Sequence, residues 1–287
     1  MFRGLYRHLC AALPALAGLA LSACESLLFY PARDLVGDPG SQGLAYREMA
    51  LETEDGLTLH AWFLPARAVK DTGCSMLFLH GNAGNISTHL SSVGWLPAAG
   101  YDVLLFDYRG FGRSEGEPSL SGLQRDFDAA FRALLDNEAG GPEDVVVFGQ
   151  SLGGAVAVTG LAASRHRHRV KALVIEGAPS DYRDITQEKL AAFWPTWPLQ
   201  WPLAQLMTDG FRPLEAIAEI SPTPLLIIHG QSDRVVPPHH GQALYEAAKE
   251  PKKIWLPEGG RHIAYLARER HRQDFARYLG DCEAKPS

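Results

Sequence analysis

Cysteine is scarce in this sequence, and basic residues do not exceed acidic ones. The 287 residues include four cysteines, and the formal net charge is −6. A chain with no basic excess lacks the electrostatic footprint of nucleic-acid binding, so we expect no nucleic acid among its partners. Cys10 and Cys24 belong to an N-terminal targeting segment, which leaves Cys74 and Cys282. Export to an oxidising compartment would permit a disulfide between them, but nothing in the sequence brings them together, and their pairing stays open.

The sequence also lacks metal-binding motifs, phosphate-binding motifs and internal repeats. The histidine pairs His166/His168 and His239/His240 have no third ligand at metal-binding spacing. Segment 107–114 follows a strand, as a phosphate loop would, but it lacks the Lys-Ser/Thr ending of a Walker motif. We interpret it as a turn held by ion pairs and glycines. The chain has no internal repeat and no low-complexity tract. We therefore expect no metal and no cofactor.

The N-terminal apolar run, residues 9–20, is too short to span a bilayer comfortably. Basic residues precede it, and the small residues at its end lead directly to Cys24. This order resembles a bacterial lipobox, in which the cysteine is lipidated and becomes the mature N-terminus. We predict a lipoprotein signal peptide over residues 1–23; an ordinary signal peptide or an uncleaved anchor is the alternative. Glu25 is not Asp, which by resemblance to lipoprotein sorting in bacteria with two membranes indicates the outer membrane, or the periplasm if lipidation fails.

The remaining chain, residues 24–287, has the composition of one large globular domain. Hydrophobic residues make up 46% of the sequence and charged residues 21%, which suits a sizeable core. Segments 46–51 and 57–63 alternate at period two around a turn and predict an edge hairpin. From residue 74 onward short apolar runs alternate with helical stretches, which indicates a mostly parallel sheet with helices on both faces. The predicted strands are 76–79, 102–106, 145–148, 172–175, 224–230 and 253–256, and a helix is predicted over 120–137.

Segment 149–154 predicts a nucleophile. An apolar run precedes it and small residues follow it, an order that indicates strand, tight turn and helix. A serine on such a turn takes strained backbone angles and stands clear of the sheet, so the Oγ of Ser151 is exposed for attack. Gly149 and Gly153 occupy the positions where the strand and helix backbones nearly touch. The pentapeptide also occurs by chance, so the assignment depends on the partners of Ser151.

A nucleophilic serine needs a histidine base and an acid that orients it. In the fold built around such a turn, the acid follows the serine in the chain and the histidine comes last. Asp233 follows strand 224–230, at the carboxyl end where catalytic groups gather in α/β sheets. His262 lies in a glycine-rich loop after the next strand. We predict the triad Ser151, Asp233 and His262, although Asp233 alone also fits a turn or a helix cap, and His262 alone a surface position.

Acyl transfer also needs two N–H donors aimed at the developing oxyanion. One is expected from Leu152, the residue after the nucleophile, and the other from the loop after an early strand. That loop is segment 80–85, where Gly81 lets the backbone turn inward, so we predict Asn82 N–H as the second donor. His80 precedes the nucleophile in the chain, contrary to the order expected of a base. We interpret it as a tether of this loop.

A long segment, about 180–222, separates two predicted strands and far exceeds a usual connection. It contains Trp194, Trp197 and Trp201, half of the six tryptophans of the chain. We interpret the segment as a small cap insertion over the site, and the three tryptophans as contacts for an apolar acyl group. The alternative is an apolar flap that only stabilises the domain.

These motifs together resemble the α/β-hydrolase superfamily in its esterase and lipase-like branch. Within it, the small serine hydrolases that include eukaryotic protein depalmitoylases and their bacterial relatives are the most similar. The resemblance covers roughly residues 28–280 and rests on segments 29–31, 80–85 and 107–114, the Ser151 turn, and the Asp233 and His262 loops. It implies the α/β-hydrolase fold and the same roles for these residues, but no particular substrate.

We therefore expect a lipid-anchored serine hydrolase of the cell envelope that cleaves small carboxyl esters or thioesters through an acyl-enzyme. Two alternatives stay open. One is a non-catalytic envelope lipoprotein that uses the pocket to bind lipids, and the other is a serine peptidase for small substrates.

Overall fold

The computed structural model describes residues 29–67, 72–136, 144–192, 194–205 and 210–283. The predicted signal peptide and Cys24 lie outside these residues. Cys74 is buried on a central strand, whereas the side chain of Cys282 lies outside the described part of the chain. Their pairing therefore stays open. Among the described residues, no helix combines the length and apolar character needed to cross a bilayer.

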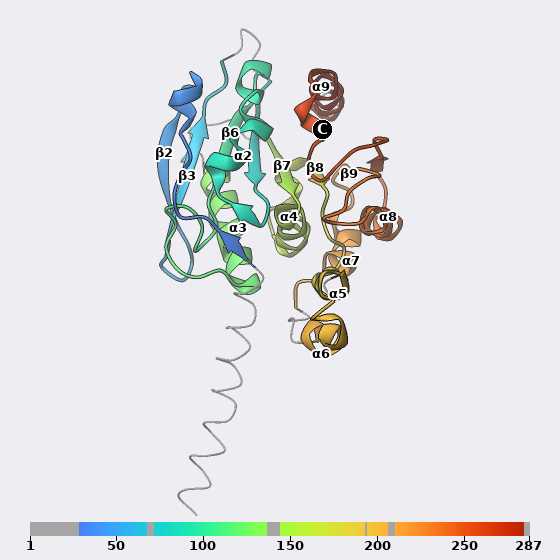
Figure 1. Cartoon of the computed structure of the whole chain (residues 1–287). Coiled ribbons are helices and arrows are strands. Elements are labelled where there is room, and N and C mark those ends of the chain that lie inside the picture. The colour runs from blue at the N-terminus through green and yellow to red at the C-terminus, as the bar shows by residue number, and fades with distance from the viewer. Residues whose placement is uncertain (1–28, 68–71, 137–143, 193, 206–209, 284–287) are drawn as a thin grey trace, which may run out of the picture.

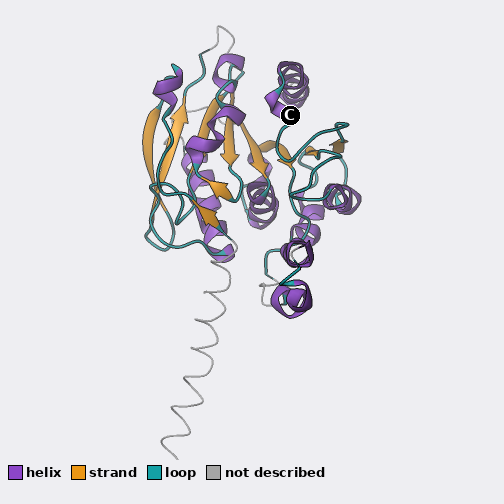
Figure 2. Cartoon of the chain, in the orientation of Figure 1, coloured by secondary structure: helices purple, strands orange, loops and turns teal. Residues whose placement is uncertain are grey.

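An eight-stranded sheet forms the centre of the molecule, in the order β10-β9-β8-β7-β4-β6-β3-β2 (Figures 1 and 2). Strand β3 pairs antiparallel with β2 and β6, and all other neighbours are parallel. The strands are β2 (Arg47–Glu52), β3 (Thr58–Leu64), β4 (Cys74–Leu79), β6 (Asp102–Phe106), β7 (Asp144–Gln150), β8 (Val170–Glu176), β9 (Leu225–Ile228) and β10 (Lys252–Trp255). Two short strands, β1 (Tyr30–Pro31) and β5 (Ala83–Gly84), form a separate parallel pair.

Helices cover both faces of the sheet, as the alternation of elements in the sequence predicted (Figure 2). The α-helices are α2 (Ile86–Val93), α3 (Leu120–Leu135), α4 (Leu152–Ala163), α5 (Tyr182–Ala192), α6 (Gln200–Ala204), α7 (Pro213–Ala216), α8 (Pro238–Ala247) and α9 (Glu269–Glu283). Short 3-10 turns are η1 (Pro39–Gln42), η2 (Leu96–Ala99), η3 (Arg167–Arg169), η4 (Trp197–Leu199), η5 (Ile217–Ile220) and η6 (Tyr265–Ala267).

The central strands divide their side chains between two apolar cores, one on each face. Because successive strand residues point to opposite faces, Val147 joins the core beneath α3 and α4, while Phe148 joins the core beneath α2 and α9. Phe148 packs against Phe275 of α9 with ring centroids 5.5 Å apart. Burial on both faces explains why the parallel strands have near-continuous apolar sequences. It also holds the carboxyl ends of β7, β8 and β9 rigidly in line.

The fold confirms the predicted architecture, including the edge hairpin, which is β2 and β3. The long insertion between β8 and β9 contains α5, η4, α6, α7 and η5. It begins at the carboxyl end of β8, and α5 and α6 extend away from the sheet there (Figure 1). The insertion is therefore joined to the sheet edge that holds the predicted triad residues.

Candidate active site

Ser151 lies between β7 and α4 in a strained backbone conformation. Its φ is 54° and its ψ is −117°, outside the regions that a side chain with a Cβ normally occupies. The Ser151 N–H donates to the Glu176 carbonyl of β8 (2.8 Å), and the Ser151 carbonyl accepts the N–H of Gly154 (3.0 Å). These bonds fix the residue at a position where strain of about 1–3 kcal/mol is sustained by the surrounding structure.

The two glycines beside the turn lie where the sequence predicted close backbone approach. A Cβ on Gly149 would collide with the backbone of Gly153, and one on Gly153 would collide with the backbone carbonyls of Leu79 and His80. Because backbone atoms cannot rotate away as side chains do, only glycine fits at either position.

This contact gives a direct test of the turn. Gly153→Ala should lower the free energy of unfolding by about 1–3 kcal/mol or more, as overpacking does, and should shift Ser151. Gly280→Ala is a matched control, since Gly280 is also helical and a Cβ added there would meet no neighbouring atom within 4 Å. There we expect a gain of about 0.5–1 kcal/mol. Equal stability of the two variants in thermal melts would show that the close approach at Gly153 is absent.

Asp233 and His262 meet although 29 residues separate them in the chain. The Nδ1 of His262 lies 2.7 Å from Oδ2 of Asp233. The other carboxylate oxygen of Asp233 accepts the backbone N–H groups of Val235 (2.8 Å) and Val236 (2.9 Å). The carboxylate is therefore held on both oxygens, and it orients the ring of His262 with the proton on Nδ1 and the lone pair on Nε2.

The negative charge of Asp233 is stabilised although its carboxylate is buried. Burial of the carboxyl group acts to raise its pKa, but the hydrogen bond and charge of His262 and the two backbone N–H groups outweigh it and lower the pKa below its ordinary value of 3.8. A lowered folded-state pKa contributes stability above the ordinary value, and this contribution is lost as the pH falls through the folded-state pKa. At neutral pH Asp233 is ionised, as an acid that orients histidine must be.

The histidine loop packs closely on the end of β8. A Cβ on Gly177 would lie 3.2 Å from Nδ1 of His262, and the φ of Gly177 is 62°. Ile263, the next residue after His262, has a φ of 41°, which is unusual for a branched side chain. Ser151 and Ile263 are the non-glycine residues with positive φ in the described parts of the chain. Backbone strain is thus concentrated at the predicted nucleophile and beside the predicted base.

Glu176 links the turn of Ser151 to the loop that carries His262. Its carboxylate accepts the side-chain amide of Gln150, the residue before Ser151, and the backbone N–H of Tyr265, both at 2.8 Å. Full burial raises the pKa of Glu176, against the lowering effect of these two hydrogen bonds and of nearby His262. Glu176 contacts the backbone of the loop that carries His262, whereas Asp233 contacts the ring itself.

The predicted oxyanion donors lie next to Ser151. Leu152 is the first residue of α4, so its N–H has no acceptor within the helix. A Cβ on Gly81 would lie 3.6 Å from the Cβ of Ser151, which brings the loop of Asn82 to the same place. The Asn82 carbonyl accepts the N–H of Tyr30 on β1 (3.3 Å). Strand β1 thereby fixes the loop that supplies the second predicted donor.

Two histidines support this loop from within. His80 is fully buried, and its Nδ1 contacts the Gly81 carbonyl at 2.7 Å, which agrees with the predicted tether. Burial, together with the nearby His89, lowers the pKa of His80 to about 4, so its ring is neutral at pH 7. His89 of α2 donates from Nε2 to the Ala83 carbonyl (3.0 Å), and its ring lies close to that of His80. His80 is thus a buried, neutral ring that contacts the backbone of its own loop.

Segment 107–114 has the structural role expected of it. Asp107 accepts the backbone N–H of Ile86 at the start of α2 (2.8 Å). Arg109 donates to Asp55 (2.8 Å) and to Asp126 (2.9 Å), and the contact with Asp126 is buried. These interactions fix the turn against α2 and α3, and through α2 they support the loop of Asn82.

The three cap tryptophans are exposed to solvent. Trp194 lies in a turn, Trp197 in η4 and Trp201 in α6, so no continuous helix aligns them. Contact between these side chains and a substrate stays a prediction.

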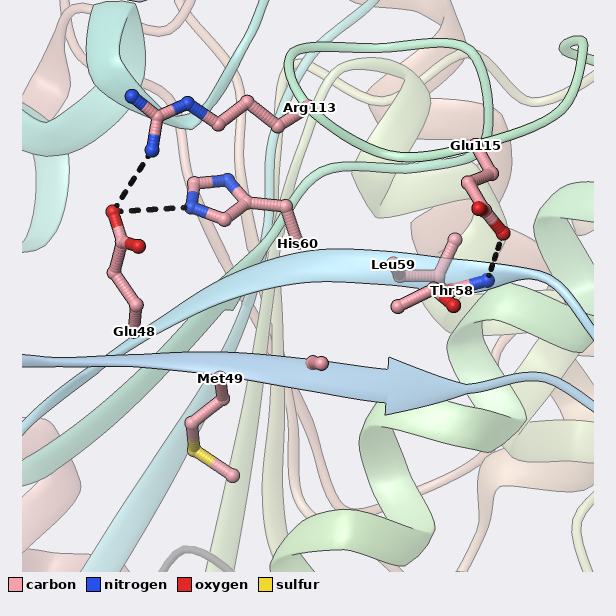
Figure 3. Close-up of a pocket in the computed structure, with 8 residues that line it drawn as sticks. Glu48, Met49, Thr58, Leu59, His60, Arg113 and Glu115 are labelled. Atoms are coloured by element: carbon pink, nitrogen blue, oxygen red, sulfur yellow. Dashed lines mark hydrogen bonds and ion pairs between the residues drawn. The ribbon is translucent and has the colours of Figure 1, made fainter.

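Two hollows lie elsewhere on the described surface. One, of about 430 Å³, lies over β2 and β3, which β4 and β6 separate from β7 (Figure 3). There Arg113 and His60 both point toward Glu48, and Glu115 accepts the backbone N–H of Thr58. Its charged groups are thus engaged with one another. The other hollow, of about 330 Å³, lies between α5 and α8.

Glu188 provides the third group that the sequence did not reveal beside His239 and His240. Its carboxylate lies 2.9 Å from Nε2 of His239 and 3.3 Å from Nε2 of His240. The Nδ1 of His240 accepts the backbone N–H of Ser180 (3.2 Å), so the neutral ring has its proton on Nε2. A metal-bound histidine needs the reverse, with a lone pair on the ligating nitrogen and a donor opposite. In this arrangement the cluster joins α5 to α8 by hydrogen bonds, although its ligand atoms lie close enough together to share a metal ion.

Sequence reasoning missed the supporting residues. Gln150, Glu176, His89 and Ile263 contribute through contacts between elements far apart in the chain, and none of them belongs to a motif that gives such a role. The one available signal was the position of Glu176 at the end of a predicted strand.

Several known proteins are similar to this chain in sequence or in fold. Residues 75–208 match the family described as alpha/beta hydrolase fold. The chain is 33% identical to YfhR of Escherichia coli (strain K12) over 83% of this chain and 80% of that protein. It is 31% identical to the alpha/beta hydrolase domain-containing protein WAV2 of Arabidopsis thaliana, over 82% of this chain and 80% of that protein. The chain belongs to the α/β-hydrolase superfamily.

Solved structures agree with this membership. The esterase Pf2001 of Pyrococcus furiosus superposes with a TM-score of 0.70 over 89% of this chain and 97% of that one, at 20% identity. At this identity the likeness shows the fold alone. Family membership and an esterase-like fold together support hydrolase activity, and they confirm the resemblance noted from the motifs.

Proposed function

We propose that this protein is a serine hydrolase that cleaves carboxyl esters or thioesters with Ser151 as nucleophile. The observation that supports it most is the 2.7 Å contact between Asp233 and His262, beside a serine held at φ 54°. Asp233 and His262 meet after the ends of β9 and β10, and Ser151 follows the end of β7 at the same edge of the sheet. Their order and chemistry are those of a catalytic triad.

The chemistry follows from the positions of these groups. His262 Nε2 accepts the proton of Ser151 Oγ as the oxygen attacks the acyl carbon, and Asp233 stabilises the imidazolium that forms. The N–H groups of Leu152 and Asn82 stabilise the oxyanion. His262 then protonates the leaving alcohol or thiol, and the Ser151 acyl-enzyme remains. Water, deprotonated by His262, hydrolyses it to the acid and frees Ser151.

A substrate panel tests the reaction class. Purified protein would be assayed on p-nitrophenyl esters of increasing chain length, on acyl thioesters and on aminoacyl amides. We expect turnover of the esters and thioesters and far slower turnover of the amides. Amide hydrolysis as fast as ester hydrolysis would favour the small-substrate peptidase, and no turnover of any class would favour the lipid-binding lipoprotein.

We also propose that Cys24 anchors the protein in the cell envelope, at the outer membrane. The apolar run that ends directly before Cys24 supports this location. The described part of the chain begins at Phe29, four residues after Glu25, so an anchor at Cys24 would hold this part close to the bilayer.

The anchor predicts the behaviour of a conservative variant. Cys24→Ser removes the thiol that would be lipidated, so it should leave an unprocessed precursor or release the protein from membranes. Mass spectrometry of the mature N-terminus and fractionation of membranes would detect either result. Cys10→Ser is the matched control, because it should leave processing unchanged. An unmodified N-terminus at a residue other than Cys24 in the wild-type protein would contradict lipidation.

A further inference from the structure

The cap insertion presents an exposed apolar surface, here called the cap face. It consists of Trp194, Trp197, Leu199, Trp201 and Leu203, whose side chains are 83%, 61%, 51%, 62% and 37% exposed. Single exposed apolar residues are ordinary on a protein surface, but a contiguous group of large ones marks an interaction surface. Five such residues lie within ten positions of the chain, in the turn before η4, in η4 and in α6.

The chemistry of the cap face suits a lipid bilayer better than a polar partner. No charged residue occurs between Lys189 and Asp209. Three of the five side chains are tryptophans, the residue type that concentrates at membrane–water interfaces because its ring is apolar and its N–H is polar. Leu199 and Leu203 together add aliphatic surface to the cap face. An uncharged aromatic surface of this kind gains by contact with the headgroup and acyl boundary of a bilayer.

The position of the cap face relative to the N-terminus points to the same partner. The insertion follows the carboxyl end of β8, and β5 follows the carboxyl end of β4; since β4, β7 and β8 run parallel, both lie at one edge of the sheet. Strand β1 pairs with β5, so the chain enters the fold at this edge. Figure 1 shows β1, in dark blue, and α6 at the same end of the molecule.

The length of chain before the fold limits how far this edge can lie from an anchor. Five residue steps separate Cys24 from Phe29, and a fully extended chain covers about 3.5 Å per residue, or about 18 Å in all. An apolar segment that ends at Cys24, whether lipidated or uncleaved, therefore keeps the β1 edge within about 18 Å of the bilayer surface.

We propose that the cap face docks on the surface of the lipid bilayer, so that the Ser151 site opens toward acyl groups held in the membrane. This inference rests on the proposed membrane anchor, and it deepens the proposed function by assigning membrane-held acyl esters or thioesters as the substrate class. Docking at the cap brings the site to its substrate without requiring the acyl chain to cross water.

Tryptophan fluorescence tests the docking without any need for turnover. The full-length protein would be reconstituted into phosphatidylcholine vesicles, with and without lipid brominated on the acyl chain close to the headgroup, since bromine quenches tryptophans that touch it. All six tryptophans lie between Trp62 and Trp255, so the N-terminal segment adds no signal. We expect clear quenching in the wild type. Changing the three cap tryptophans to Phe should remove most of it, whereas the control Trp95→Phe should retain it.

A second pair of variants tests the apolar contact itself. Leu199→Glu places a charge on the cap face and should reduce the quenching, whereas Leu199→Met keeps the surface apolar and should not. Both changes fall on an exposed side chain, so the fold should persist. A wild-type protein that shows the quenching but has no esterase activity would refute the proposed function and not the docking.

Three results would overturn the docking. They are quenching absent from the wild type, quenching unchanged in the triple variant, and a cap face buried in a dimer that the Leu199→Glu variant splits into monomers in sedimentation measurements.

Discussion

Ser151→Ala should lower kcat for every cleaved ester by about 10³-fold or more, because removal of the nucleophile leaves only the oxyanion donors and binding to accelerate hydrolysis. The backbone of residue 151 is held by hydrogen bonds of its own N–H and carbonyl, which alanine keeps. We therefore expect the melting temperature to change little. Kinetics on a p-nitrophenyl ester, with circular dichroism melts of the same preparation, would measure both quantities.

Ser91→Ala is the matched control for this loss. Ser91 is an exposed serine of α2, away from the triad, so the same chemical change there should leave kcat unaltered and stability within about 0.5 kcal/mol. Near-wild-type esterase activity in Ser151→Ala would mean that another residue attacks the acyl carbon.

Asp233→Asn should reduce kcat by roughly 10²- to 10⁴-fold. The amide can still meet His262, but it favours the tautomer with the proton on Nε2, where the base must accept one. It also removes the negative charge that stabilises the imidazolium. Both effects act on the chemical step, so kcat should fall more than KM changes.

Glu176→Gln tests whether the loss of activity in Asp233→Asn reflects the orientation of His262 or only the removal of a buried carboxylate near the site. Glu176 accepts hydrogen bonds on both oxygens, from Gln150 and from Tyr265 N–H. In Glu176→Gln one of these oxygens becomes an NH2 group, which faces another N–H donor and cannot bond to it. This should lower the free energy of unfolding by about 1–3 kcal/mol. Its loss of activity should be much smaller than that of Asp233→Asn. The reverse ranking, with full activity in Asp233→Asn, would move the acid to Glu176.

The parts of the site that the sequence predicted well are those tied to local patterns. Ser151 lies in a turn whose glycines are required by backbone contact within a few residues of it. Asp233 and His262 each follow an apolar run that forms a strand, and parallel strands bring their carboxyl ends to one edge. Chain order and element type were therefore sufficient to select Asp233 and His262, whose side chains meet, and their action on Ser151 stays a prediction.

The supporting contacts could not be predicted in the same way. Glu176 joins Gln150 to Tyr265, which lies 89 residues further along the chain, and no short pattern encodes that bond. His89 supports the oxyanion loop from a helix surface. Long-range packing decides such features.

Covalent labelling identifies the nucleophile without any need to know the substrate. The purified protein would be treated with a fluorophosphonate, which forms a stable bond with an activated serine oxygen, and the modified peptide would be identified by mass spectrometry. We expect a single adduct on Ser151, prevented by Ser151→Ala and slowed in Asp233→Asn. An adduct on another residue, or an esterase-active protein that does not react, would contradict it.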